Sequence, residues 1–296
     1  MVASIINCSA PEEADAVIVS APYEHGASFG GGASLGPAAI VACLERQIEL
    51  LERHTRTEPA CDYEIAHRVL DGLAELAPTA MVERVAAALR ATSPFAVLLG
   101  GIHSVTIGAL QALAARGRPE AITVVQLDAH LDLRDDDGDY NDVDPSRYAH
   151  SCVMRRACEL GFRTCSVGIR AYSREEQRFA LEHGLPVFEW GRGAEPTVEA
   201  LLAAIPTEQV YLTVDVDGFD PAVTPATGTP VPGGLSWGYG TRLIRALFLA
   251  KDVVGADLVE VAPVAGSALT EYAAAQLCYD IVSYRLLKRD GKLVFV

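Results

Sequence analysis

The sequence lacks the features that mark membrane and secreted proteins. It has no run of about 18 uncharged apolar residues, so we expect no membrane-spanning helix. Its first residues, MVASIINCSAPEEAD, have no basic segment and turn acidic at once, so we expect no signal peptide. A Ser- or Pro-rich linker, an internal repeat and a low-complexity tract are also missing. We therefore expect a single domain over residues 1–296.

Paired cysteines are missing as well. The seven cysteines are an odd number, are scattered along the chain and include no Cys-x-x-Cys pair. This pattern is typical of a reducing compartment, so we expect a cytoplasmic protein, and it argues against a thiolate metal site. We expect most of them to be small core residues. Cys152 closely follows the candidate residue His150, so a functional position stays open for it.

Positive charge is scarce. Lys and Arg number 24 against 39 Asp and Glu, and the formal net charge is −15. Binding to nucleic acid needs clustered Lys and Arg, so we expect no nucleic-acid partner. The negative charge favours a cationic ligand or a bound metal, although acidity that keeps the protein soluble explains the balance equally well.

Short, almost uniformly apolar segments alternate with segments of helical periodicity. Strands covered on both faces have this composition, and a repeated strand–helix order builds a parallel sheet. We therefore predict an α/β fold of three layers (αβα), with helices on both faces of a parallel sheet of roughly eight strands. The predicted strands are 16–20, 95–99, 122–127, 164–168, 186–188, 209–214, 253–259 and 292–296. The predicted helices are 38–54, 81–91, 105–116, 174–183, 198–204, 237–250 and 273–289.

Ionisable side chains follow four of these strands at the point where each strand ends. Ligands of parallel sheets bind beyond the carboxyl ends of the strands, and residues two apart share one face of a strand. We therefore expect these side chains to converge at one edge of the sheet. They are His103 after strand 95–99, Asp128, His130 and Asp132 after 122–127, Asp215, Asp217 and Asp220 after 209–214, and Glu260 after 253–259.

Such a cluster predicts metal binding. Several carboxylates cannot share a small volume without cations, because like charges in a low-dielectric site repel strongly. Carboxylates and imidazoles without thiolates favour Mn²⁺ over zinc on ligand type, and the ligands are too many for one ion. Two bridged ions per subunit would hold a hydroxide nucleophile at neutral pH, which indicates a hydrolase. Taken alone, the segment DAHLD (128–132) could be a solvated loop and the segment DVDGFDP (215–221) an ordinary turn.

Three segments together resemble the metal-binding signatures of the ureohydrolases, the family of arginases and agmatinases. They are GGIHS (100–104), DAHLD (128–132) and TVDVDGFDP (213–221). Further similar segments are PATGTPVPGGL (225–235), VEVAP (259–263) and the Gly-rich SFGGGASLGPAAI (28–40). The resemblance covers nearly the whole chain and implies an arginase-like fold in a homotrimer or homohexamer. One departure is Ile102, where many members carry an acidic residue, but this is not a ligand position.

The resemblance also implies a role for each site residue. His103 and Asp132 would bind one Mn²⁺, His130 and Asp217 the other, and Asp128 and Asp215 would bridge the two. Asp132 would also accept a hydrogen bond from the bridging hydroxide. Glu260 would hold the substrate guanidinium in a bidentate pairing. His150, in RYAHSCVMRRACELG (147–161), would stand before a helix and shuttle a proton to the leaving amine; a helix-capping or core histidine is the alternative.

The segment around His150 resembles the agmatinase branch. It lacks the S-G-N-x-H-G pattern with which arginases read the α-carboxylate of arginine, so we expect hydrolysis of agmatine to putrescine and urea. Aminopropylagmatine, guanidinobutyrate or another guanidino acid, arginine, and formiminoglutamate stay open as substrates. A binuclear metallophosphatase would need Arg or Lys near the metals. A family member that binds polyamines without turnover would lack a ligand, and every ligand position is filled.

An acidic loop separates Asp132 from His150. A calcium loop is excluded, because Tyr140 stands where Gly is required and Ser146 where Glu is required. The loop is either an ordinary solvated segment or a cover over the pocket that attracts a distal ammonium of the substrate. Its aspartates are Asp135, Asp136, Asp137, Asp139, Asp142 and Asp144.

Overall fold

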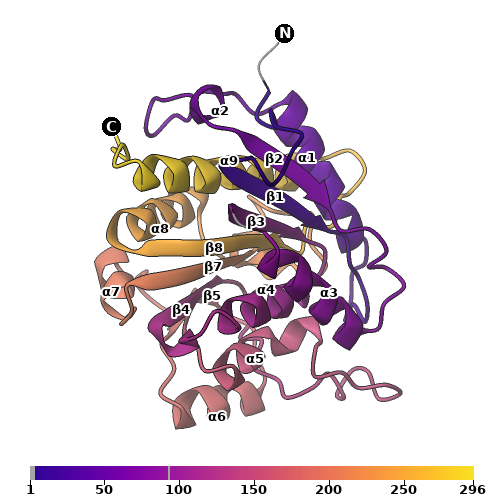
Figure 1. The fold of residues 1–296 in the computed structure, drawn as a ribbon. Coiled ribbons are helices and arrows are strands. Elements are labelled where there is room, and N and C mark those ends of the chain that lie inside the picture. Colours follow the sequence, from indigo (N-terminus) through magenta and orange to yellow (C-terminus); the bar gives the residue numbers. More distant parts are fainter. Residues whose placement is uncertain (1–3, 93) are drawn as a thin grey trace.

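Eight parallel strands form the central sheet of the computed structural model, which describes residues 4–92 and 94–296 (Figure 1). The order across the sheet is β2-β1-β3-β8-β7-β4-β5-β6. In the chain these strands are β1 (Ala16–Ala21), β2 (Ile65–Val69), β3 (Phe95–Gly100), β4 (Ile122–Leu127), β5 (Arg163–Ile169), β6 (Val187–Glu189), β7 (Gln209–Asp215) and β8 (Asp252–Val259).

Helices cover both faces of the sheet and divide the core into two halves (Figure 1). On one face lie α1 (Gly36–Arg46), α2 (Pro59–Asp62), α7 (Val198–Ala203), α8 (Trp237–Ala250) and α9 (Leu269–Arg289). On the other lie α3 (Pro78–Arg90), α4 (Val105–Ala114), α5 (Val153–Glu159) and α6 (Arg174–Glu182). The predicted three-layer αβα fold with a parallel sheet is confirmed.

Local sequence explains the position of several elements. All six residues of β4, ITVVQL, are buried, as expected for a strand covered on both faces. The helix α8 begins where it was predicted because the Ser236 side chain accepts a hydrogen bond from the Tyr239 backbone N–H. Ser173 and Glu176 form a capping box at the start of α6.

The prediction of a strand at residues 292–296 is wrong. After α9 the chain turns at Gly291. The ring of Phe295 then packs on Tyr284 of α9, with the two ring centroids 4.9 Å apart. The apolar residues of this segment therefore cover a helix and do not extend the sheet. The missing eighth strand is β2, which pairs with β1 at the edge of the sheet. Its sequence, IAHRV, contains two polar residues and lacked the apolar signal used for the other strands.

The first predicted helix is too long. The helix α1 ends at Arg46 and not near residue 54. Buried Glu52 accepts hydrogen bonds from the backbone N–H groups of His54 and Thr55, at 2.9 and 2.6 Å, and from the Tyr284 hydroxyl at 3.2 Å. These contacts stabilise a turn where helical periodicity continues in the sequence.

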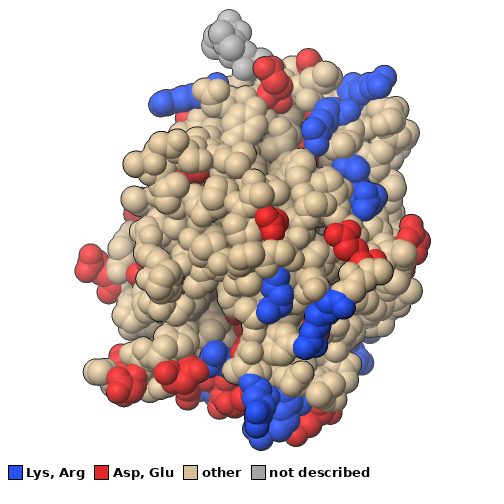
Figure 2. Space-filling view, turned by 180° about the vertical axis from the view of Figure 1, so that it is seen from behind, with Lys and Arg blue, Asp and Glu red and all other residues tan. Residues whose placement is uncertain are grey.

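The four strands that carry the candidate residues are neighbours in the middle of the sheet, in the order β3-β8-β7-β4. Their carboxyl ends therefore meet at one edge, as predicted. Within the described residues, no helix is long and apolar enough to cross a membrane. On the face of the molecule shown in Figure 2, basic side chains lie among acidic ones.

Candidate metal centre and active site

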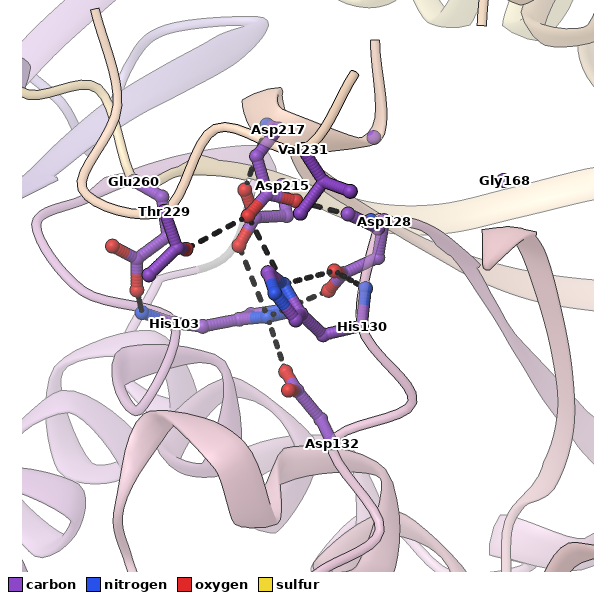
Figure 3. Close-up of polar contacts among 12 residues, drawn as sticks. His103, Asp128, His130, Asp132, Gly168, Asp215, Asp217, Thr229, Val231 and Glu260 are labelled. Carbon is purple, nitrogen blue, oxygen red and sulfur yellow. Dashed lines mark hydrogen bonds and ion pairs between the residues drawn. The ribbon is translucent and has the colours of Figure 1, made fainter. Parts of the chain in front are cut away.

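Seven of the predicted residues come together at the carboxyl edge of the sheet, and their side chains point toward one another (Figure 3). Asp220 does not join them, because its carboxylate accepts the backbone N–H groups of Ala222, Gly233 and Gly234. Asp128, His130 and Asp132 lie directly after β4. Asp215 is the last residue of β7, and Asp217 lies in the short 3-10 helix η4 (Val216–Gly218) that follows. His103 lies between β3 and α4, and Glu260 follows β8.

Three carboxylates surround the Nδ1 atom of His103. This atom lies 2.9 Å from Asp132 Oδ2, 3.3 Å from Asp128 Oδ2 and 3.6 Å from Asp215 Oδ2. His103 is fully buried, and its Nδ1 atom has no hydrogen-bond partner. His103, Asp128 and Asp132 offer ligand atoms close enough together to hold one metal ion.

A second group of ligand atoms adjoins the first and shares Asp128 with it. His130 Nδ1 lies 3.1 Å from Asp217 Oδ2 and 3.5 Å from Asp128 Oδ1. Asp128, His130 and Asp217 could also hold one ion. The two oxygens of Asp128 thus face different groups, which is the arrangement that a bridging ligand requires. Asp215 directs one oxygen to His103 and accepts the backbone N–H of Asp217 at 2.9 Å with the other.

The electrostatics of the cluster favour cations. Burial, together with the charge of Asp128, raises the pKa of Asp132 to about 7. Burial raises the pKa of Glu260 to about 8, and it also raises that of Asp215. Carboxylates whose ionisation is opposed in this way need positive charge beside them. The buried, unpartnered imidazole nitrogen and the oxygen-rich donor set therefore fit two divalent ions.

Two site residues adopt a backbone conformation that L-residues rarely adopt. Asp132 has φ 52° and Glu260 has φ 66°, and neither is glycine. Such residues cost roughly 1–3 kcal/mol each and cluster at functional sites. At Glu260 the surrounding contacts hold this conformation, because its backbone N–H donates to Gly101 O at 2.8 Å and its Oε1 accepts the His103 N–H at 2.7 Å.

A pocket of about 360 Å³ opens above the cluster, and His150, Glu260, Asp132 and Asp215 line it. His150 begins the 3-10 turn η3 (His150–Cys152), which leads into α5, and its Nδ1 lies 3.9 Å from Glu260 Oε1. Burial, followed by the positive charges of His130 and His103, lowers the pKa of His150 to about 4. A neutral imidazole offers one nitrogen as donor and the other as acceptor, which suits proton transfer.

The acidic loop contributes to the pocket through Arg134 and Tyr140, and none of its aspartates is among the described residues that line the pocket. Asp135 pairs with Arg147 and Arg156, and Asp139 pairs with Arg134. Buried Asp137 accepts the Ser146 N–H at 2.5 Å. The loop thus uses these three aspartates to hold its own conformation, which weakens the hypothesis that they attract a substrate ammonium.

Cys152 is fully buried and is not among the described residues that line the pocket. Burial raises the pKa of its thiol to about 12, which is typical of an inert structural cysteine. The position left open for Cys152 is therefore a packing position.

Sequence reasoning missed several side chains that support the cluster. Gln126 donates to Asp128 Oδ2 at 2.7 Å, and Thr229 donates to Asp217 Oδ2 at 3.1 Å. Arg170 donates to the backbone carbonyls of Asp217 at 2.6 Å and Val231 at 2.6 Å and so ties two loops together. The polar Gln126 inside an apolar strand was a usable signal. Arg170 gave none, because its partners are distant in the sequence.

Comparisons with known proteins show the family to which the chain belongs. The model of the arginase family matches residues 14–283. The chain is 39% identical over 284 residues to an N(1)-aminopropylagmatine ureohydrolase from Synechocystis sp., covering 92% of this chain and 89% of the relative. It is 31% identical to an agmatinase from Pyrococcus horikoshii, covering 92% of each chain.

A solved structure shows the same fold. The agmatine ureohydrolase of Thermoplasma volcanium superposes with a TM-score of 0.83 at 27% identity, covering 96% of this chain and 94% of that one. The match to the family extends over most of the chain, and members of the family act on small guanidino substrates. The chain therefore belongs to the arginase family and is a ureohydrolase, which cleaves a carbon–nitrogen bond of a guanidino substrate.

Proposed function

We propose that this protein hydrolyses the guanidinium group of a guanidino-amine and releases urea, with N(1)-aminopropylagmatine as the preferred substrate. Agmatine, the substrate expected from the sequence, is the second candidate and would give putrescine. The observation that carries the proposal is the pair of His/Asp groups that share Asp128 and face a pocket containing Glu260 and His150.

Each site residue has a proposed role. His103 and Asp132 would hold one Mn²⁺ and His130 and Asp217 the other, with Asp128 and Asp215 between them. Two such ions, when bound, would supply a water activated for attack at neutral pH. Glu260 would bind the guanidinium through charge-assisted hydrogen bonds and hold its carbon toward the metal cluster. His150 would pass a proton to the nitrogen of the departing amine.

The charges that line the pocket support an amine and not an acid as the distal group of the substrate. Among the described lining residues, Arg134 is the one strongly basic side chain. It is paired with Asp139, and its Nε lies 3.8 Å from Glu176 Oε2. An uncommitted cation at this place would favour a guanidino acid or a phosphate ester, and Arg134 is already paired. The choice of the aminopropyl compound over agmatine rests on the greater similarity to the Synechocystis relative than to the Pyrococcus agmatinase.

The test is urea release by the Mn²⁺-loaded protein with four substrates assayed side by side. They are aminopropylagmatine, agmatine, guanidinobutyrate and arginine. We expect the highest kcat/KM for aminopropylagmatine, and Glu260→Gln should lower it by about 100-fold or more by removing the guanidinium partner. A preference for agmatine would keep the reaction and correct the substrate. A preference for guanidinobutyrate or arginine would contradict the charge argument.

We further propose that the protein assembles as a homotrimer or homohexamer, as its resemblance to the family implies. Sedimentation equilibrium of the Mn²⁺-loaded protein measures the number of subunits directly.

A further inference from the structure

A chain of buried side chains lies behind His103, on the side of the ring away from the carboxylate cluster. His103 Nε2 lies 2.8 Å from Thr213 Oγ1, and Thr213 Oγ1 lies 2.6 Å from Asp257 Oδ1. All three residues are fully buried. Asp257 belongs to none of the segments that predicted the site, and it lies outside the two groups of ligand atoms.

The topology of the sheet makes this contact possible. The strand β8 lies between β3 and β7, so a side chain on β8 can reach elements that follow both neighbours. Asp257 is the register partner of Thr213 on β7 and of Leu98 on β3, and His103 follows β3. Asp257 on β8 thus lies behind His103, the candidate ligand that follows the neighbouring strand β3.

Asp257 accepts hydrogen bonds from three side-chain hydroxyls. Its Oδ2 accepts hydrogen bonds from the Tyr211 hydroxyl at 2.7 Å and the Thr106 hydroxyl at 2.9 Å, while its Oδ1 accepts from Thr213. Three hydroxyl groups thus donate to its two oxygens, and hydrogen bonds of this kind stabilise the ionised form. A carboxylate has no proton to donate, so the Thr213 hydroxyl must donate to it.

The direction of the next contact follows. The Thr213 hydroxyl has one proton, which Asp257 accepts, so its oxygen must accept from the N–H of His103 Nε2. The Nδ1 atom is then the ring nitrogen that faces the three carboxylates, and it is the buried atom without a hydrogen-bond partner. Metal-bound histidines commonly donate their other N–H to an acceptor in this way, which fixes the ring and raises ligand basicity.

We propose that Asp257 is a positioning residue that acts through Thr213 to orient the His103 ring and present Nδ1 to a metal ion. The relay Asp257–Thr213–His103 rests on the metal role proposed for His103. It predicts that the affinity for Mn²⁺ depends on two residues that are not themselves ligands.

The test is a Mn²⁺ titration of the metal-free protein, in which the electron paramagnetic resonance signal measures the concentration of free Mn²⁺. Thr213→Val removes the hydroxyl at nearly constant volume and should weaken one of the two sites by about 10- to 100-fold. Asp257→Asn should have a similar effect, because its amide cannot replace both acceptor oxygens. Thr213→Ser restores the hydroxyl and should stay within about 3-fold of the wild type.

Tyr211→Phe is the matched control. It removes a buried hydroxyl from the same carboxylate but leaves the path to His103 intact, so its Mn²⁺ affinity should also stay within about 3-fold of the wild type. Circular dichroism of each metal-free variant establishes that it folds. If Asp257→Asn does not fold, the comparison of Thr213→Val with Thr213→Ser decides.

The outcomes separate the relay from the metal centre. Equal Mn²⁺ binding by folded Thr213→Val and Thr213→Ser would overturn the relay, as would a loss in Tyr211→Phe as large as that in Asp257→Asn. A wild-type protein that binds no Mn²⁺ would overturn the metal centre and the relay together.

Discussion

Asp128 is the residue on which the two candidate ion positions depend. It is fully buried, its two oxygens face different histidines, and Gln126 and the His130 N–H hold it in place. Its place in the cluster was predictable because the spacing D-A-H-L-D is short and lies at the end of an apolar strand. Short motifs at strand ends identified the candidate ligands that the structure brings together, and they also included Asp220, which lies outside the cluster.

Replacing Asp128 with Asn should abolish metal loading and turnover together. The amide has the same shape but no charge, so each ion would lose one of its two shared carboxylates; we expect activity to fall by at least about 100-fold. Metal content by mass spectrometry and urea release measure the two effects. Asp142→Asn, in an exposed part of the acidic loop, is the control and should retain both. A variant at position 128 with two ions and full activity would refute the site assignment.

The supporting residues were not predictable from local spacing. Arg170 contacts a carbonyl 61 positions further along the chain, and Thr213 lies 110 positions from His103. Their contacts, like that of Asp257, depend on which strands are neighbours. Short motifs therefore indicated the candidate ligands, while the side chains that contact them could be found only from the strand order.

At the scale of the elements, the strand predictions failed where the apolar content of a segment did not match its burial in the sheet. The edge strand β2 is partly exposed and carries polar side chains, whereas the apolar C-terminal segment packs on α9. Central strands buried on both faces were predicted closely because burial forces an apolar run. The failures lie away from the carboxyl edge of the central strands, so the site was unaffected by them.

The long helix α9 carries a buried acid that should make stability depend on pH. Burial raises the pKa of Asp280 to about 7 from 3.8, so the folded protein binds this proton more tightly than the unfolded chain does. The stabilisation is present at acidic pH. It falls as the pH rises from about 4 to about 7, where the folded carboxyl also ionises.

Asp280→Asn should remove this part of the pH dependence. Asn keeps an acceptor for the Gln276 amide, which lies 2.7 Å from Asp280 Oδ1. Urea unfolding of the metal-free proteins at pH 5.5 and 8.5 measures the effect. We expect the wild type to lose roughly 1–2 kcal/mol more than the variant between these values. Equal losses would show that Asp280 does not bind the proton in this range.

At the scale of the whole molecule, the strand order concentrates negative charge at one place. Three neighbouring strands, β8, β7 and β4, end in carboxylates, and these carboxylates are largely buried. Ions that bind only the folded protein stabilise it, and here they also offset repulsion among the ligands. Metal binding and the stability of the fold are therefore coupled.

Removing metal should lower the melting temperature. We expect a chelator to lower the Tm by roughly 5–10 °C. A free Mn²⁺ concentration of about 100 times Kd adds about 2.7 kcal/mol to the free energy of unfolding, and the chelator removes this contribution. Differential scanning calorimetry with and without Mn²⁺ measures the change, and re-addition of Mn²⁺ should reverse it. The Asp128→Asn variant should show no response to Mn²⁺. If the wild-type Tm does not change, metal binding at the cluster does not stabilise the fold.

The left-handed backbone at Asp132 and Glu260 also bears on how this protein could be re-engineered. Glycine adopts such angles without a steric penalty, so a glycine at Asp132 would relieve backbone strain and at the same time delete a carboxylate of the cluster. At Glu260 a glycine would also leave the buried His103 N–H without its acceptor, which offsets the relief of strain. An inert scaffold would therefore be stabilised at position 132, whereas a better catalyst would need its added stability elsewhere.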